Sequence, residues 1–536
     1  MNDSMNLHGK NIAGGDLSGL GQKTFFGYDP RAGRRLNMPF YQATEEEVNR
    51  AMELAAQAFP VFRESPAPTV AGFLETIAAE IEALGEQLIE QAAAETGLGI
   101  ERLRSERGRT VNQLRMFAGL IREGSFVDAR IDPALADRKP VSRPDVRRML
   151  IPVGPVVVFG AGNFPLAYSV AGGDTASALA AKNPVVVKGH PAHPGTSELV
   201  AGAVTRAVRA AGLPAGVFSM LQGSDPSISL TLVRHAQTKT VAFTGSLRAG
   251  RAIFDAATCR PEPIPVYAEM GSTNPVFVLP NAVRERADAL AQGLTNSVCL
   301  GAGQFCTCPG LVFTVDDEAF AGFRDKLRQA FDQAAPATML HPGIAKGYEE
   351  AVRQASKIAG VALRLSPQRA NSGRTEGAPA LLETDAATWL ANELLHNEVF
   401  GPSTIVVRGR SEEELLCVAE SLPGTLTATV HGTPEDLKKF HKLIALLEIR
   451  CGRLIFNGYP TGVEVGPAMH HGGPYPATTD PKFTSVGTAA ILRFLRPICY
   501  QNFPHEALPP ELRNENPGKI WRTVDGVLTR DPVKTI

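Results

Sequence analysis

A series of short apolar runs, each followed by a loop or a helix-like stretch, restricts the fold of this chain more than any other feature. The runs cover residues 156–159, 184–188, 217–221, 240–243 and 265–268. Valine and other apolar residues dominate them, which is typical of strands that are buried on both faces of a sheet. Helix-like stretches lie at about 174–182, 196–211 and 225–235. This alternation predicts an α/β fold built on a parallel sheet.

Helical and irregular segments flank these runs. Thr44 and Glu47 have the spacing of a capping box and predict the start of a helix, and two further helical stretches are expected at 68–96 and 101–123. Residues 501–536 are rich in proline and polar side chains. We expect them to form a tail that packs on a partner or remains mobile.

The overall composition argues against several classes of partner. The chain has 536 residues, of which 44% are apolar and 20% charged, and its formal net charge is −1. A chain of this size and balance is expected to be a soluble globular protein with several domains. Nucleic acids and anionic membranes are bound by clustered lysine and arginine, so the near-neutral charge argues against both.

The seven cysteines form no regular framework. An odd number in a long chain favours a reducing compartment, and the N-terminus has no apolar signal segment, so we expect a cytoplasmic protein. Cys306 and Cys308 are close in sequence, but no second Cys/His pair lies near them, and we therefore predict no metal site. Residues 149–173 carry no charge, yet their prolines and glycines indicate a buried strand and loop rather than a membrane span.

Cys306 lies in a glycine-rich stretch, Gly301-Ala-Gly-Gln-Phe-Cys-Thr-Cys-Pro-Gly310, between a helix-like run and an apolar strand. A thiol attacks as thiolate and needs nearby dipoles and access to a substrate. The glycines allow close backbone approach, and the N–H groups around Cys306 are candidates to bind an oxyanion. The stretch alone fits a nucleophile and a buried structural cysteine equally well.

Three polar residues stand where strands of the predicted sheet end. Asn163 has an amide that can donate to an oxyanion, Glu269 is a candidate general base, and Lys188 lies at the edge where parallel sheets bind ligands. The alternatives are an ordinary turn residue, a salt-bridged or solvated glutamate and a solvated lysine. Gly245 and Ser246 offer a small turn at a helix start, which suits a nucleotide phosphate or simply caps the helix. Together Lys188 and this turn favour a nucleotide site.

Six motifs in the same order give the chain a resemblance to the aldehyde dehydrogenase superfamily over nearly its whole length. They are Asn163-Phe-Pro-Leu166, Lys188, Phe243-Thr-Gly-Ser246, Glu269-Met-Gly-Ser-Thr-Asn-Pro275, Gly303-Gln-Phe-Cys306 and Glu398-Val-Phe-Gly-Pro402. The resemblance implies that Cys306 is the nucleophile, Glu269 the general base and Asn163 the oxyanion amide. It also implies a cofactor site that includes Lys188, Gly245, Ser246, Glu398 and Phe400.

The resemblance further implies an architecture. We expect a cofactor-binding domain formed by residues 1–134 and 152–269, a second α/β domain that is catalytic at 270–480, and an oligomerisation arm. The arm would comprise a hairpin at 135–151 and residues 481–500, with a strand at 489–495, and residues 501–536 would be an extension. With such an arm, we expect a homodimer or homotetramer.

The loop after Lys188 and the turn at Cys306 look most similar to bacterial α-ketoglutaric semialdehyde dehydrogenases, and also resemble NADP-dependent long-chain fatty aldehyde dehydrogenases. The first resemblance implies a substrate with a carboxylate, for which Arg109 is the candidate clamp. The alternative is that the arginines near it pair with Glu101 and Glu106 on a solvated helix face. A non-catalytic binding or structural relative is the alternative of another class.

The choice of cofactor is expected to depend on the loop after Lys188. NAD-selective relatives often carry an acidic residue three positions on, and Pro191 occupies that position here. We therefore predict that NADP is accepted and preferred, with NAD possible. The loop at 221–226 contains no arginine to clamp a phosphate, so the preference is expected to be modest.

Overall fold

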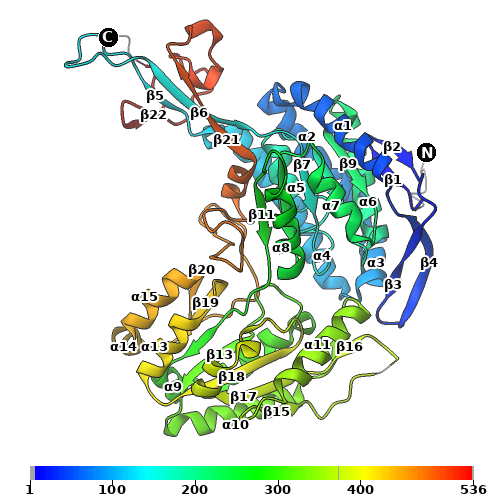
Figure 1. Cartoon of the computed structure of the whole chain (residues 1–536), viewed down its shortest axis with the longest axis vertical. Helices are drawn as coiled ribbons and strands as arrows, with labels where there is room; N and C mark the ends of the chain where they lie inside the picture. Colours follow the sequence, from blue (N-terminus) through cyan, green and yellow to red (C-terminus); the bar gives the residue numbers. More distant parts are fainter. Residues whose placement is uncertain (1–6, 372, 534–536) are drawn as a thin grey trace.

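A computed structural model describes residues 7–371 and 373–533 (Figure 1). Within this part of the chain, three large sheets of seven, seven and five strands organise the structure. Figure 1 shows the first sheet among the blue to green segments and the second among the green to yellow segments, while the third projects from them as an arm. The predicted α/β fold class with parallel sheets is confirmed.

The first sheet has the strand order β11-β10-β7-β8-β9-β1-β2. Strands β7 to β11 pair in parallel, and β1 joins β9 in the antiparallel direction. Each of the five parallel strands overlaps one of the apolar runs described above. The bounds are β1 (Asn11–Ala13), β2 (Asp16–Ser18), β7 (Val156–Phe159), β8 (Val185–Lys188), β9 (Phe218–Leu221), β10 (Thr240–Thr244) and β11 (Val266–Glu269).

Helices cover both faces of the first sheet. Alternate residues of β7 point to opposite faces, so Val156 and Val158 join one apolar cluster and Val157 and Phe159 join another. The first cluster includes residues of α2 (Ala67–Ala83), α3 (Gly85–Thr96), α4 (Ile100–Glu123), α5 (Gly173–Ala180) and α6 (Pro194–Ala210). The second includes residues of α1 (Glu45–Arg63), α7 (Pro226–Arg234) and α8 (Leu247–Thr258). The predicted capping box between Thr44 and Glu47 opens α1.

The second sheet has the order β15-β17-β18-β13-β12-β19-β20, and only β15 runs antiparallel to its neighbour. Helices again pack on both faces. The strands are β12 (Val276–Val278), β13 (Leu311–Val315), β15 (Ala362–Leu365), β17 (Ala380–Asp385), β18 (Ser403–Gly409), β19 (Thr425–His431) and β20 (Cys451–Phe456). The helices are α9 (Pro280–Cys299), α10 (Glu318–Gln333), α11 (Pro342–Ala355), α12 (Ala386–Ala391), α13 (Glu412–Ser421), α14 (Pro434–Lys439) and α15 (His441–Arg450).

The arm is a five-stranded sheet in the order β21-β6-β5-β22-β23. Its strands are β5 (Arg130–Asp132), β6 (Val146–Pro152), β21 (Leu495–Gln501), β22 (Arg522–Val524) and β23 (Val527–Thr529). The predicted hairpin therefore starts earlier than residue 135. The strand predicted at 489–495 is wrong, because η5 (Thr488–Phe494) is a 3₁₀ helix that packs on α5, and the strand begins only at Leu495.

The extension, expected as a tail that packs on a partner or remains mobile, packs on the arm of its own chain. Its strands β22 and β23 join the arm of the same chain, and β22 pairs in parallel with β5. Arg522 is completely buried and donates to four backbone carbonyls of the extension, those of Glu511, Arg513, Asn514 and Asp531. Leu508, Leu512 and Ile520 complete a small apolar core with the arm.

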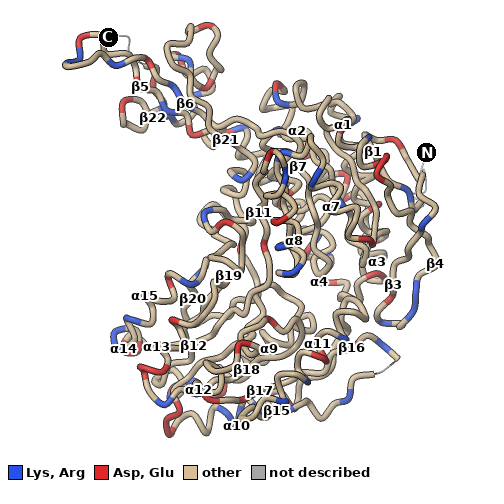
Figure 2. The backbone as a smooth tube through the Cα atoms, viewed as in Figure 1, with Lys and Arg blue, Asp and Glu red and all other residues tan. Residues whose placement is uncertain are grey.

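The remaining strands form two small sheets outside the three large ones. Two antiparallel pairs are β3 (Thr24–Asp29) with β4 (Arg34–Tyr41) and β14 (Ala337–Thr338) with β16 (Glu376–Gly377). Figure 2 shows lysine and arginine interspersed with aspartate and glutamate along the chain. Among the helices of the described residues, none combines the length and the apolar character that a bilayer span requires.

Candidate active site

Cys306 is held in a loop whose geometry depends on glycine and asparagine. The chain leaves α9 through η3 (Leu300–Gly303) and turns at Gly303, where φ is +67° and an added Cβ would lie 2.1 Å from the carbonyl oxygen of Gly401. Only glycine fits such an approach. The side-chain amide of Asn274 donates to the carbonyls of Cys306 and Cys308 at 2.8 and 3.0 Å. These contacts fix the backbone from which the Cys306 thiol projects.

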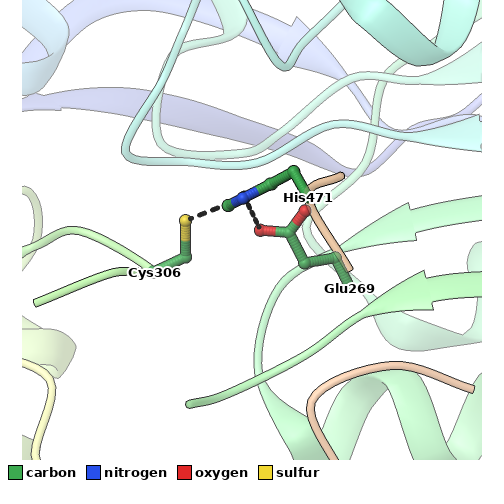
Figure 3. Close-up of side chains that lie close together, drawn as sticks. All are labelled: Glu269, Cys306 and His471. Atoms are coloured by element: carbon green, nitrogen blue, oxygen red, sulfur yellow. Dashed lines mark hydrogen bonds and ion pairs between the residues drawn. The ribbon is translucent and has the colours of Figure 1, made fainter. Parts of the chain in front are cut away.

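Glu269 and His471 lie beside this thiol, as Figure 3 shows. Glu269 ends β11, and His471 comes from the long segment between β20 and η5. His471 Nε2 lies 3.1 Å from Glu269 Oε1 and 3.7 Å from Cys306 Sγ. Ser485 donates to Glu269 Oε2 at 2.7 Å and to the His471 carbonyl at 3.2 Å. The three side chains therefore form one hydrogen-bonded cluster.

The surroundings of the cluster shift the pKa values of Glu269 and Cys306 in opposite directions. Burial raises the pKa of Glu269, but the influence of His471 and the hydrogen bonds from His471, Ser485 and Cys306 outweigh it and hold the pKa below that of a free glutamate. Burial and then the Glu269 charge raise the pKa of Cys306 well above that of a free thiol, although Arg109 opposes this shift. At neutral pH the resting site therefore holds a carboxylate and a protonated thiol.

The contacts of His471 favour one state of its ring. Nδ1 is buried and has no hydrogen-bond partner among the described residues. A proton on Nε2 leaves Nδ1 as a bare acceptor, which costs less than a buried donor without a partner. In this state Nε2–H donates to Glu269 and faces the Cys306 sulfur.

Asn163 lies on the other side of the same loop. One N–H of its amide donates to the carbonyl of Gln304 at 2.9 Å, two residues before Cys306. Arg102 donates to the backbone carbonyl of Asn163 at 2.8 Å and stacks between the rings of Phe164 and Phe305. The amide is thereby oriented toward the cysteine loop, and its second N–H remains to donate elsewhere.

Arg109 does not form the surface ion pair that was the alternative to a substrate clamp. Its Nη2 donates to the Tyr168 hydroxyl at 2.8 Å, its guanidinium lies over the Tyr168 ring, and its Nε is buried without a partner. Among the described residues, no carboxylate forms an ion pair with it. Glu101 instead pairs with Arg104, and Glu106 is buried and accepts from the backbone of Leu166 and Ala167.

Three of the predicted cofactor residues line one cavity. Lys188, Gly245 and Ser246 border a cavity of about 330 Å³ together with Pro191 and Asp225. Burial lowers the pKa of the Lys188 amine to about 8, and within the described residues this amine has no hydrogen-bonding or ion-pair partner. Ser246 caps α8, and an added Cβ at Gly245 would lie 2.6 Å from the Phe243 ring. The cavity thus combines a cation with the N-terminus of a helix.

The other two predicted cofactor residues lie apart from that cavity. Glu398 and Phe400 border a small cavity beside Thr273 and Phe305. Gly271 allows the Glu398 carboxylate to approach, because an added Cβ there would lie 2.4 Å from Glu398 Oε2. Burial raises the pKa of Glu398 to about 7, although a backbone hydrogen bond from Ser272 opposes the shift.

His471 and Ser485 are the residues of the site that sequence reasoning missed. His471 follows Cys306 by 165 positions and stands in the segment Met469-His-His-Gly-Gly473. The pair of histidines in a glycine-rich loop was the one available signal, but it does not distinguish His470 from His471. Asn274 belonged to a recognised motif, and its role in holding the cysteine loop emerges only from its hydrogen bonds.

The chain is similar to known proteins over most of its length. Residues 21–475 match the model of the aldehyde dehydrogenase family. The chain is 48% identical over 523 residues to α-ketoglutaric semialdehyde dehydrogenase 2 of Azospirillum brasilense, which covers 97% of this chain and 99% of the relative. It is 46% identical over 493 residues to an α-ketoglutaric semialdehyde dehydrogenase of Acinetobacter baylyi, covering 92% and 93%.

Solved structures give the same fold. A betaine aldehyde dehydrogenase of Staphylococcus aureus in complex with NAD⁺ has a TM-score of 0.79 at 18% sequence identity, and the match covers 93% of this chain and 98% of that one. At this identity the likeness concerns the fold.

Proposed function

The chain belongs to the aldehyde dehydrogenase family, and from this premise we propose that it oxidises α-ketoglutaric semialdehyde to α-ketoglutarate with NADP as the preferred cofactor. The contact of Cys306 with Glu269 through His471 is the observation that carries the chemistry, because it joins a nucleophile to a base. The similarity to two curated α-ketoglutaric semialdehyde dehydrogenases and the unpaired charge of Arg109 support the substrate.

In the proposed reaction, the Cys306 sulfur adds to the aldehyde carbon. The thiol loses its proton to solvent, and Nε2–H of His471 stabilises the developing thiolate. The free N–H of Asn163 and the Cys306 backbone N–H hold the oxyanion. Loss of a hydride from this carbon, which a bound nicotinamide would accept, gives the Cys306 thioester. The Cys306 thioester is then hydrolysed by a water that Glu269 activates, and the product is the carboxylic acid.

The residues present fit a dinucleotide. The free amine of Lys188 suits ribose hydroxyls, and the first turn of α8 at Ser246 suits a phosphate. Glu398 would bind the second ribose from its separate position. These residues would hold the cofactor and thereby set its position relative to Cys306.

We expect kcat/KM to be higher for NADP than for NAD, by less than about tenfold, which corresponds to about 1.4 kcal/mol. Pro191 offers no carboxylate to repel a 2′-phosphate, but Asp225 borders the same cavity and limits the preference. Steady-state kinetics with both cofactors test this expectation, and Asp225→Asn should increase the preference for NADP. A strong preference for NAD would refute it.

The substrate is tested through Arg109. Losing a charge-assisted hydrogen bond costs about 1.5–3 kcal/mol, so Arg109→Ala should lower kcat/KM for α-ketoglutaric semialdehyde by about 10- to 100-fold, mainly through KM. Uncharged short aldehydes should be affected little. Arg104→Ala, which removes an exposed arginine of the same helix, and Tyr168→Phe, which keeps the guanidinium, are the controls.

Two outcomes would contradict the substrate proposal. An unchanged KM for the carboxylated aldehyde in Arg109→Ala would remove the clamp. If a long-chain aldehyde turned over faster than both α-ketoglutaric and glutarate semialdehyde, the alternative of a long-chain fatty aldehyde dehydrogenase would be preferred.

We further propose that the chain forms at least a homodimer. Strands β20 and β21 are the edges of the second sheet and of the arm, and β20 exposes Leu454 and Phe456. Exposed apolar edge strands are sites of pairing with another chain. Sedimentation should give a mass of twice 57.1 kDa or more, and a monomer at assay concentration would disprove the assembly.

All seven cysteines are free, which supports a cytoplasmic location.

A further inference from the structure

The cluster of Cys306, His471 and Glu269 also has the composition of a metal site. One sulfur, one nitrogen and one oxygen ligand atom lie within 4.8 Å of one another (Figure 3). We predicted no metal site from the sequence, in which these three ligands lie far apart along the chain. We propose that these three side chains bind a borderline-soft divalent cation of the zinc class reversibly, and that binding inhibits the enzyme.

The distances support this proposal. Ligand bonds of a tetrahedral zinc ion place its nitrogen and sulfur ligands about 3.5 Å apart and its nitrogen and oxygen ligands about 3.4 Å apart. The corresponding separations are 3.7 Å from His471 Nε2 to Cys306 Sγ and 3.1 Å from His471 Nε2 to Glu269 Oε1. All three ligand atoms lie within 4.8 Å of one another, so small side-chain movements complete three corners of a tetrahedron. The fourth corner is left to water, as in catalytic zinc sites.

The charges and the surroundings support it as well. A thiolate and a carboxylate together neutralise a divalent ion, so the occupied cluster adds no net charge to a buried site. His471 and Glu269 are almost completely buried, with side-chain exposures of 0% and 3%. Ser485 fixes the far oxygen of Glu269, and Thr484 accepts the backbone N–H of His471. The ligands are therefore held in place before an ion binds.

One feature limits the affinity. A ligating histidine usually donates its other ring nitrogen to an acceptor, but His471 Nδ1 has no partner among the described residues. We therefore infer a reversible inhibitory site rather than a resident cofactor. Occupation would hold the Cys306 sulfur and the Glu269 carboxylate together, so that neither could act on an aldehyde.

Cobalt(II) is the probe for this site, because it takes zinc geometry and absorbs visible light. Titrating the reduced, chelator-treated full-length enzyme should bind one cobalt per chain, with a thiolate-to-cobalt charge-transfer band and the intense visible bands of a four-coordinate ion. Zinc should displace the cobalt, protect one thiol from alkylation and inhibit turnover, and a chelator should reverse all three effects. The spectrum requires no substrate, so it stands even if the proposed substrate is wrong.

Substitutions identify the ligands. Cys306→Ser should abolish the charge-transfer band, and His471→Asn should weaken cobalt binding at least about tenfold. Cys308→Ser, which changes the neighbouring thiol, should leave the band unchanged. Thermal unfolding and cofactor binding verify that each variant is folded. The proposal would be overturned if the charge-transfer band were absent or if the spectra were those of a six-coordinate ion. It would also be overturned if Cys308→Ser lost cobalt binding while His471→Asn kept it.

Discussion

Replacing Cys306 by alanine is expected to lower kcat for aldehyde oxidation by at least about 10⁴-fold, because no other group at the site can form the thioester. Cofactor binding, measured by fluorescence of the reduced dinucleotide, should change little, because Cys306 does not line the cavity of Lys188. The measurement is single-turnover and steady-state formation of reduced cofactor.

Cys308→Ala is the matched control for this prediction. Cys308 is buried two residues away and its thiol faces the carbonyl of Val298 at 3.7 Å, so its loss should leave turnover within a few-fold of normal. Ordinary turnover in Cys306→Ala together with an inactive Cys308→Ala would show that the nucleophile has been assigned to the wrong cysteine.

Glu269→Gln should separate the two halves of the reaction. We expect a burst of reduced cofactor followed by a steady state that is slower by about 10²- to 10⁴-fold, because the amide cannot activate water for hydrolysis of the thioester. The same change removes a negative charge that raises the pKa of Cys306. Alkylation of Cys306 at neutral pH should therefore become faster while turnover becomes slower.

The pH dependence of alkylation follows from the same pKa. Only the thiolate reacts, so alkylation of the native enzyme should accelerate as pH rises toward the raised pKa of Cys306, and in Glu269→Gln the acceleration should occur at lower pH. Glu198→Gln, a buried glutamate that binds the backbone of His8 and Gly9, is the control and should change neither rate. A Glu269→Gln enzyme with no burst and unaltered turnover would exclude Glu269 as the base.

The sequence was informative where structure is local. The five parallel strands of the first sheet are buried on both faces and therefore read as continuous apolar runs, and the capping box at Thr44 is set by residues three apart. Cys306, Glu269 and Asn163 stand in recognisable motifs, so their positions could be named in advance. Their catalytic roles remain predictions.

For other parts of the chain, the sequence led to a wrong prediction or to none. The resemblance implied a strand at 489–495, but Ala490, Ile491 and Phe494 are buried at the spacing of a helical turn, and a short apolar run does not distinguish a helix from a strand. The extension appeared polar because its fold depends on one buried arginine and a few scattered apolar residues. His471 could not be selected because only the tertiary fold brings it to Cys306.

The three side chains of the cluster come from different parts of the fold. Glu269 is the last residue of β11 in the first sheet, and Cys306 precedes β13 in the second. His471 belongs to the segment between β20 and η5, which also bonds to β11, because the Thr479 N–H donates to the Ala268 carbonyl. A small separation of the two sheet units would dismantle this cluster while leaving both sheets intact. Loss of activity on mild heating or in dilute denaturant would thus report the docking of two folded bodies, and it should precede the loss of secondary structure.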